Sequence, residues 1–272
     1  MKLANAFGLW TELSLALQTA LIPTMKDVWK KPATISHLSR TFMAHVWIAF
    51  ASQVDANART VKRELFLPNA TGVVLDIGAG LGHGVQYLDH SKITKYVAVE
   101  PNIRMHPELR RSAAAAGYLE SNGTLVILGC GAEEIMTILE SLGSTMHAVD
   151  TITSVMSMCS IPSAEEALRG LVRHVLKPGG QLLFYEHVLS PRKDVAWWQR
   201  FWAPMWQIFY DGCRLDCPTD IWIGNIMDSD DNGETVNIWS ERKLWGVPGE
   251  TEETVFHHVL GKFVKREGRM IS

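Results

Sequence analysis

The chain of 272 residues is 47% hydrophobic and 20% charged, which supplies enough apolar side chains for a sizeable buried core and excludes a globally disordered chain. A formal net charge of −3 argues against a large nucleic-acid-binding surface, so we expect no nucleic-acid partner. The four cysteines have no second ligand pair at zinc spacing, which predicts the free thiols of a cytoplasmic protein and no metal site.

The first predicted element is an amphipathic helix over residues 3–22. One of its faces collects apolar side chains, namely Leu3, Ala6, Trp10, Leu13, Leu17 and Leu21. We favour docking of this helix on the rest of the chain. The alternative is peripheral contact with a membrane surface, with Lys26, Lys30 and Lys31 as flanking cations.

Residues 35–66 predict two further helices, because no proline or glycine interrupts them. They carry Phe42, Trp47 and Phe50, which are most simply core residues packed against the domain. Residues 1–70 therefore predict an N-terminal helical cap. The sharper hypothesis is a lid that closes over an acceptor.

A buried strand followed by a glycine-rich turn is predicted over residues 73–84. The apolar run enters Asp76, and Gly78, Ala79 and Gly80 follow it. Glycines at such a place let the backbone turn tightly and approach a ligand without a Cβ clash. The spacing is G-x-G-x-G, which differs from the G-x-G-x-x-G of dinucleotide dehydrogenases. A helix is expected to start at residue 85 with its N-terminus towards an anionic group.

Four more strands are expected along the chain, at residues 96–100, 124–129, 150–154 and from residue 181 onwards. The second strand ends in Glu100, and a carboxylate there can accept both ribose hydroxyls of an adenosine. Ser154 lies near the carboxyl end of the fourth strand, where open α/β sheets bind ligands. A Lys-Pro-Gly-Gly turn at residues 177–180 precedes the fifth strand.

Together these marks resemble the class I S-adenosylmethionine (SAM) methyltransferases. The resemblance implies SAM as cofactor and an α/β fold, with a Rossmann-like, seven-stranded, mostly parallel sheet, one antiparallel strand and helices on both faces. Residues 71–272 would form this domain, with an aromatic-rich insertion near residues 191–235 on the acceptor side. Residues 234–241 and 254–265 are expected to supply the last two strands.

The resemblance also implies a set of cofactor-binding residues: Asp76, Gly78, Ala79, Gly80, Glu100, Pro101, Asn102, Ala132, Glu133 and Ser154. Asp76 would face the ammonium group of the cofactor or backbone N–H groups of the turn. Ala132 and Glu133 would lie beside the adenine, with Glu134 as a competing candidate.

The acceptor side begins at the end of the fifth strand, where His187 follows Glu186. We expect His187 to be the first candidate for a catalytic base, followed by Asp211 and His258. The alternative is that His187 only shapes the pocket. The following segment is rich in aromatic residues, namely Trp197, Trp198, Phe201, Trp202, Trp206, Phe209 and Tyr210. Such a segment predicts an apolar acceptor pocket, a membrane-facing surface or packing on the N-terminal helices.

A narrower resemblance rests on short pieces spread in order along the chain: GLW (8–10), KRELF (62–66), EPN (100–102), EHV (186–188), FYDGC (209–213) and H-x-x-G-x-x-V-K (258–265). They are similar to the membrane-associated thiol S-methyltransferases, which methylate small lipophilic thiols. The resemblance implies association with a membrane as the alternative to a purely cytoplasmic location. No residue pattern indicates an oligomeric state.

We therefore expect a SAM-dependent methyltransferase that acts on a lipophilic small molecule by in-line SN2 transfer. The acceptor would be a thiol, or an enolic or phenolic hydroxyl such as that of a polyketide pyrone in secondary metabolism. Two alternatives stay open: a SAM-binding protein of this fold that methylates nothing, and a methyltransferase of macromolecules.

Overall fold

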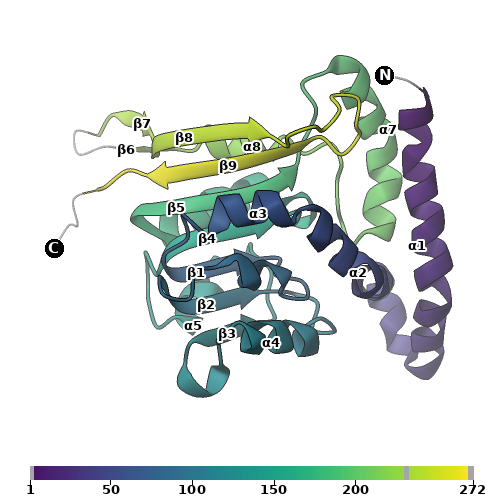
Figure 1. The fold of residues 1–272 in the computed structure, drawn as a ribbon, viewed down its shortest axis with the longest axis horizontal. Helices are drawn as coiled ribbons and strands as arrows, with labels where there is room; N and C mark the ends of the chain where they lie inside the picture. The colour runs from purple at the N-terminus through teal and green to yellow at the C-terminus, as the bar shows by residue number, and fades with distance from the viewer. Residues whose placement is uncertain (1–2, 230–232, 269–272) are drawn as a thin grey trace.

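A seven-stranded sheet forms the centre of the computed structural model, which describes residues 3–229 and 233–268 (Figure 1). In chain order its strands are β1 (Gly72–Ile77), β2 (Ile93–Val99), β3 (Leu125–Leu128), β4 (Val149–Val155), β5 (Leu176–His187), β8 (Trp239–Gly246) and β9 (His258–Lys265). Their spatial order is β3-β2-β1-β4-β5-β9-β8. Strand β9 runs antiparallel to both neighbours, and the other described pairings in this sheet are parallel. The predicted Rossmann-like α/β sheet is confirmed.

Helices cover both faces of this sheet. One face packs against α3 (Arg59–Phe66), the short 3-10 helix η2 (His83–Tyr87) and α4 (His106–Ala115). The other face packs against α5 (Ile135–Ser141), α6 (Ala164–Gly170), the π-helical turn η5 (Leu171–Val175) and α8 (Thr219–Gly224). The remaining elements are α1 (Leu3–Lys30), η1 (Pro32–His37), α2 (Leu38–Asn57), η3 (Glu120–Asn122), η4 (Met158–Ser160), α7 (Lys193–Phe209) and the ribbon of β6 (Met227–Ser229) and β7 (Thr235–Asn237).

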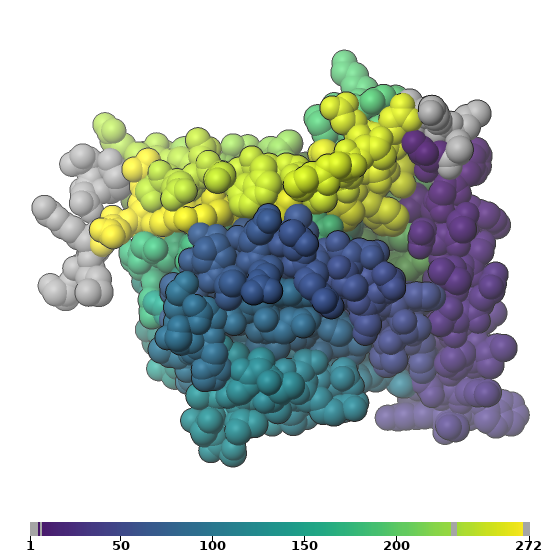
Figure 2. Space-filling view, in the orientation of Figure 1, coloured from purple at the N-terminus to yellow at the C-terminus, as the bar shows by residue number. Residues whose placement is uncertain are grey.

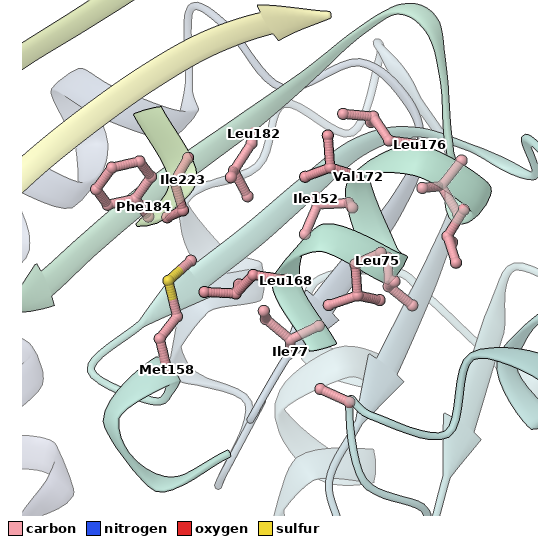
Figure 3. Close-up of a cluster of buried hydrophobic side chains, with 14 of the residues drawn as sticks. Leu75, Ile77, Ile152, Met158, Leu168, Val172, Leu176, Leu182, Phe184 and Ile223 are labelled. Carbon is pink, nitrogen blue, oxygen red and sulfur yellow. The ribbon is translucent and has the colours of Figure 1, made fainter. Parts of the chain in front are cut away.

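The apolar run of β1 shows why both faces are covered. Neighbouring side chains of a strand point to opposite faces, so Val74 packs towards α3 and α4 while Leu75 packs towards α6. On the second face, Leu75 and Ile77 meet Leu168 of α6 in a fully buried cluster (Figure 3). Burying one such side chain stabilises the fold by about 1.5–3 kcal/mol. A parallel sheet that is buried on both faces therefore accounts for the unbroken apolar run.

The helices α1, α2 and α7 pack together as a helical layer beside the carboxyl ends of the strands (Figure 1). In the space-filling view α1 lies along one side of the molecule (Figure 2). Its buried residues Leu9, Leu13, Ala16 and Ala20 contact the other helices of this layer. The expected docking of the first helix is therefore what the structure has. None of the described helices is both long and apolar enough to cross a membrane.

Two expectations about α1 are wrong. The helix does not end at residue 22 but continues through Pro23 to Lys30, because packing on both sides of the proline outweighs the lost backbone hydrogen bond. The buried face shares Leu13 and Leu17 with the predicted one but is rotated from it at both ends. Trp10 and Leu21 are 57% and 48% exposed, whereas Leu9 and Ala20 are buried.

Two expectations about later elements also need correction. The helix expected from residue 85 is only the five-residue η2, preceded by Gly82 in a left-handed conformation at φ 80°. Such a short turn carries little helix dipole. The segment 234–241 spans β7 and the start of β8, because Ile238 separates the two strands and is itself buried.

Candidate functional site

The turn after β1 is fixed by backbone hydrogen bonds to the end of β2. Gly78 and Ala79 donate their N–H groups to the Val99 carbonyl oxygen at 2.9 and 3.1 Å. Gly78 has a φ of 67°, and a Cβ there would collide with the Ser157 side chain. The glycine is therefore required by both conformation and space.

Glu100, at the end of β2, holds the rest of this turn. Its Oε2 accepts the Gly80 N–H and its Oε1 accepts the Asn102 N–H, both at 2.8 Å. Each carboxylate oxygen keeps a second lone pair for a ligand hydroxyl. The side chain is only 6% exposed, and this burial raises the pKa of Glu100. Pro101 lies at the bend, and Asn102 donates its side-chain N–H to the Arg40 carbonyl of α2 at 2.9 Å.

Asp76 is buried near the end of β1, on the strand beside β2. Its carboxylate accepts hydrogen bonds from the Tyr96 hydroxyl at 2.6 Å and the Thr153 hydroxyl at 2.9 Å. Its protein partners are therefore hydroxyls of neighbouring strands and not the N–H groups of the turn. Burial raises the pKa of Asp76, and the two hydroxyls and Lys62 oppose that shift.

A buried ion pair that the sequence analysis missed lies beside Asp76. The Lys62 ammonium group of α3 contacts the Asp55 carboxylate, which also accepts the Tyr87 hydroxyl at 2.8 Å. Burial lowers the pKa of Lys62. Asp55, Lys62 and Asp76 line one cavity with Gly78, so two carboxylates and one ammonium group lie beside the glycine turn.

This cavity is nearly closed by α2. Its volume is about 50 Å³, whereas pockets for small ligands usually have about 300–1,000 Å³. Trp47 of α2 covers the turn, and a Cβ on Gly80 would lie 2.8 Å from the Trp47 Nε1. A ligand of the size of SAM fits the chemistry of the lining but needs α2 to move outwards.

The other predicted cofactor residues lie further along the carboxyl ends of the strands. Ala132 is buried after β3, and the Glu133 side chain is exposed and folds back over Gly131. Glu134 accepts the Gly131 N–H at 2.8 Å and so braces this loop. Ser154 donates its hydroxyl hydrogen to Glu186 at 2.5 Å, which places it in a different network.

That network fixes the segment after β4. The buried Glu186 carboxylate accepts the backbone N–H groups of Ser157 and Met158 at 3.1 and 3.3 Å. Burial raises the pKa of Glu186, and these hydrogen bonds oppose the shift. The Ser157 hydroxyl donates to the Ile77 carbonyl oxygen at 2.7 Å, so the segment is also tied to β1.

His187 lies at the end of β5 in a buried cluster with two cysteines, which we call the Cys-His-Cys cluster (Cys159, His187 and Cys213). The His187 Nε2 lies 3.4 Å from the Cys213 Sγ, which lies 3.1 Å from the Cys159 Sγ. The His187 Nδ1 is buried and has no hydrogen-bond partner among the described residues. Burial lowers the pKa of His187, but interaction with Cys159 and Glu186 outweighs it, so the net shift is upwards.

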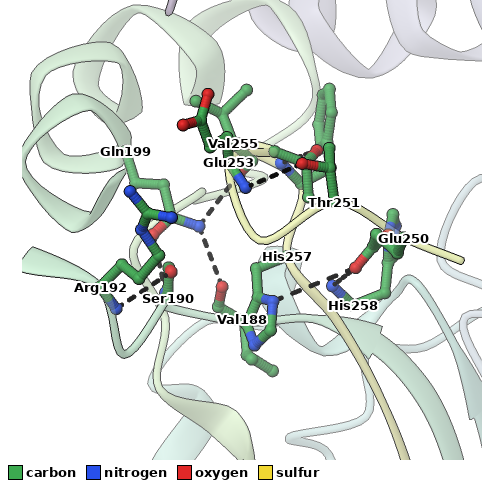
Figure 4. Close-up of polar contacts among 12 residues, drawn as sticks. Val188, Ser190, Arg192, Gln199, Glu250, Thr251, Glu253, Val255, His257 and His258 are labelled. Atoms are coloured by element: carbon green, nitrogen blue, oxygen red, sulfur yellow. Dashed lines mark hydrogen bonds and ion pairs between the residues drawn. The ribbon is translucent and has the colours of Figure 1, made fainter. Parts of the chain in front are cut away.

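The other two predicted catalytic residues have partners elsewhere. Asp211 accepts from Arg40 of α2 at 3.1 Å, and its N–H donates to the Ser39 hydroxyl. The His258 Nδ1 lies 2.5 Å from a Glu250 carboxylate oxygen (Figure 4). The three candidates therefore do not form one hydrogen-bonded set.

The aromatic segment divides into a buried and an exposed part. Trp206 and Tyr210 are buried, and Phe256 packs edge-on to both Trp206 and His187. Gln199 ties α7 in place by donating to the Val188 and Val255 carbonyl oxygens at 2.9 and 3.0 Å (Figure 4). Trp197 and Phe201 stack on each other and are both 57% exposed. Phe256 therefore joins His187 to the buried aromatic side chains of α7, whereas Trp197 and Phe201 face outwards.

Comparisons with known proteins agree with this geometry. A family model described as "Methyltransferase domain" matches residues 50–244. The chain is 27% identical over 236 residues to thiol S-methyltransferase TMT1B of Rattus norvegicus, covering 84% of this chain and 88% of that protein.

Solved structures share the fold at low identity. An O-methyltransferase family protein from Burkholderia thailandensis superposes with a TM-score of 0.57 at 9% identity, over 92% of this chain and 72% of that chain. The [4+2]-cyclase SpnF gives a TM-score of 0.51 at 13% identity, over 79% and 83%.

Proposed function

The chain belongs to the methyltransferase domain family and is a SAM-dependent methyltransferase, and from this premise we propose that it methylates the sulfur of a lipophilic small-molecule thiol. The observation that carries the proposal is the buried His187 at the carboxyl end of β5, which contacts Phe256 and through it the buried Trp206. The similarity to a thiol S-methyltransferase over 84% of the chain favours sulfur as the accepting atom.

On the cofactor side, we propose that Glu100 accepts the ribose hydroxyls while it keeps its bonds to the turn. Asp76 would pair with the ammonium group of the amino-acid part, and Lys62 with its carboxylate. Gly78, Ala79 and Gly80 would let the backbone approach the cofactor, and Ala132 and Glu133 would border the adenine. SAM supplies an electrophilic methyl group, and these side chains hold it in one orientation.

On the acceptor side, we propose that His187 acts on the acceptor thiol. Asp211 and His258 would position the walls of the pocket, because each is already held by an oppositely charged or hydrogen-bonding partner. The nucleophile and the methyl group must be close and collinear for SN2 transfer, so a closed pocket favours the reaction. Packing of α1 and α7 over the Cys-His-Cys cluster supplies that closure.

The acceptor class is tested by turnover with a matched panel of lipophilic thiols, phenols and enolic pyrones. Release of S-adenosylhomocysteine with the thiols, together with a thioether product, supports the proposal. Methyl ethers formed from the phenols or pyrones, with no thioether, would assign the enzyme to oxygen acceptors and overturn it. A reaction that consumes an acceptor without forming S-adenosylhomocysteine would favour a non-methylating role.

We also propose that α1 and α7 contact a membrane surface peripherally. On α1, Ile22 is 63% and Trp29 is 89% exposed, with Lys30 beside them, and on α7 Trp197 and Phe201 are both 57% exposed. Aromatic and basic residues on one surface suit the headgroup region of an anionic bilayer. Co-sedimentation with anionic vesicles is expected to fall in Trp29→Ser. The exposed Met136 of α5 gives the matched control Met136→Ser, and equal losses in both variants would refute the proposal.

A further inference from the structure

The Cys-His-Cys cluster joins three metal-ligating side chains from three parts of the chain. Cys159 belongs to η4 after β4, His187 ends β5, and Cys213 follows α7. One ligand atom of each lies within 4.8 Å of the other two. All three side chains are buried. We propose that the cluster binds a Zn²⁺ ion and that the open coordination position of this ion takes the sulfur of the acceptor thiol.

The spacing of the ligand atoms is close to that of a tetrahedral zinc site. Zinc lies about 2.3 Å from thiolate sulfur and about 2.0–2.1 Å from imidazole nitrogen, so tetrahedral geometry puts sulfur and nitrogen about 3.6 Å apart and two sulfurs about 3.8 Å apart. The corresponding distances are 3.4 Å for Cys213 to His187 and 3.1 Å for Cys213 to Cys159. To reach tetrahedral geometry the sulfur pair needs to separate by about 0.7 Å and the sulfur–nitrogen pair by about 0.2 Å, and the third pair, Cys159 to His187, lies within 4.8 Å.

The number of ligands indicates an open site. Structural zinc sites in proteins use four protein ligands, whereas catalytic sites use three and leave one position for water or substrate. Among the described residues, the group that shares this spacing contains three His, Cys, Asp or Glu side chains and no fourth. Thiolate sulfur and imidazole nitrogen are ligands that zinc binds well, whereas the harder cations magnesium and calcium prefer oxygen ligands.

The surroundings suit a lipophilic thiol at the open position. Phe256 stacks edge-on to His187, and Trp206, Tyr210 and Leu13 belong to the same apolar cluster as the two cysteines. The turn that binds the cofactor is also close, because Ser157 packs against Gly78 only two residues before Cys159. The ligand atoms are buried, so an acceptor reaches them only when the covering helices shift.

The role given to the open coordination position rests on the proposed thiol substrate. The binding of Zn²⁺ by the cluster does not. As the acceptor sulfur joins the metal, the S–H bond breaks and its proton passes to solvent. The sulfur then forms a bond to the methyl carbon while the bond from that carbon to the cofactor sulfonium breaks. The products are a thioether, which is a weak ligand and leaves, and S-adenosylhomocysteine.

The first test is metal binding by the full chain under reducing conditions. We expect one Zn²⁺ per chain, and titration with Co²⁺ in its place is expected to give a thiolate-to-cobalt charge-transfer band with intense visible bands of a tetrahedral ion. Cys159→Ser and Cys213→Ser should each lose most of that band. Cys130→Ser is the matched control, because Cys130 is buried on the cofactor side and should leave the band unchanged.

Several outcomes would overturn the metal site. They are a wild-type chain that binds neither ion, a band that survives in both cluster variants, and a Cys159–Cys213 disulfide as the stable form under the same reducing conditions. Because the spectra are measured on the wild-type chain first, a variant that fails to fold does not decide the result.

The second test concerns the open position. Adding a lipophilic thiol to the Co²⁺-loaded protein should shift the visible bands, and a phenol of the same size should not. Unchanged bands with the thiol, or full S-methylation by metal-free protein, would overturn this role while leaving the proposed function intact. Metal binding without any S-methylation would instead refute the proposed function and leave the metal site standing.

Discussion

The two sides of the ligand-binding edge satisfy their buried polar groups in opposite ways. On the cofactor side, Asp76 and Glu100 each accept two hydrogen bonds from neighbouring groups. On the acceptor side, the His187 Nδ1 lacks a partner among the described residues, and the other ring nitrogen faces the Cys213 thiol, which contacts the Cys159 thiol. A site whose groups are already paired is organised for repeated binding of one cofactor. A site in which a ring nitrogen faces only thiols has ligand atoms left for something that it binds.

The largest expected effect separates the two sides by catalysis. His187→Ala should lower kcat by about 10²–10⁴-fold, because it removes a side chain that activates the acceptor thiol, and leave SAM affinity unchanged. His258→Asn is the control. Because the His258 side chain is held by Glu250, this variant should lose far less of its kcat. Steady-state kinetics beside calorimetric SAM titration makes the distinction. Equal kcat values for His187→Ala and wild type would show that His187 only shapes the pocket and does not act on the acceptor thiol.

The next effect should appear in SAM binding alone. Glu100→Ala removes the two charge-assisted hydrogen bonds that we propose to the ribose, each worth about 1.5–3 kcal/mol, so the SAM affinity should fall about a hundredfold or more. Glu100→Gln keeps one carbonyl oxygen that can accept a hydrogen bond from the turn, so its SAM affinity should fall less. Calorimetry measures both variants. Unaltered affinity in Glu100→Ala would remove the ribose assignment.

A smaller effect should come from the side chain that closes the cavity. Trp47→Ala removes the indole above Gly80, so SAM should associate several-fold faster because less of the population is closed. Stopped-flow binding measures the rate. The exposed Trp10 provides the control Trp10→Ala, which should bind at the wild-type rate. Slower association in Trp47→Ala would mean that Trp47 packs on the bound cofactor instead of blocking it.

The smallest expected effect is a pH dependence of the cofactor side. Burial raises the pKa of both Asp76 and Glu100, so both protonate at a higher pH than ordinary carboxyl groups. SAM affinity should therefore fall as the pH drops through these raised pKa values. In this pH window the same two groups bind more protons in the folded than in the unfolded chain. The free energy of unfolding of the cofactor-free protein should therefore rise as the pH drops through the window.

Calorimetric SAM titration and denaturant unfolding at a series of pH values measure the two trends. Glu100→Gln should weaken both trends because it removes one of the titrating groups. Affinity and stability that change in the same direction would contradict the assignment of the two raised pKa values.

The grouping of Asp76, Gly80 and Glu100 at one edge of the sheet could be predicted because its signals are local in sequence. Asp76 and Gly80 are four residues apart, and Glu100 ends the next strand, so sheet topology alone brings them together. The acceptor side could not be predicted in the same way. Cys159 and Cys213 are 54 residues apart and meet only after β4, β5 and α7 have packed. The spacing rule for zinc sites considers neighbours in sequence and therefore missed them.

Other differences come from tertiary packing that sequence patterns do not contain. The sequence analysis assigned Lys62 no role of its own, and its burial follows from the contact with Asp55 of α2. The KRELF piece that carries it was the available signal. Pro23 read as a helix end, but contacts of Ala16 and Ala20 with the helical layer hold α1 together through it.

The most direct test of the account is an intramolecular competition. The acceptor is one lipophilic molecule that carries both a thiol and a phenolic hydroxyl, and the donor is SAM with a ¹³C-labelled methyl group. After turnover, the carbon that bears the label is located by NMR, and S-adenosylhomocysteine is quantified by mass spectrometry. The account predicts the label on sulfur with one S-adenosylhomocysteine for each thioether. A label on oxygen, or no transfer from enzyme that binds SAM, would contradict it.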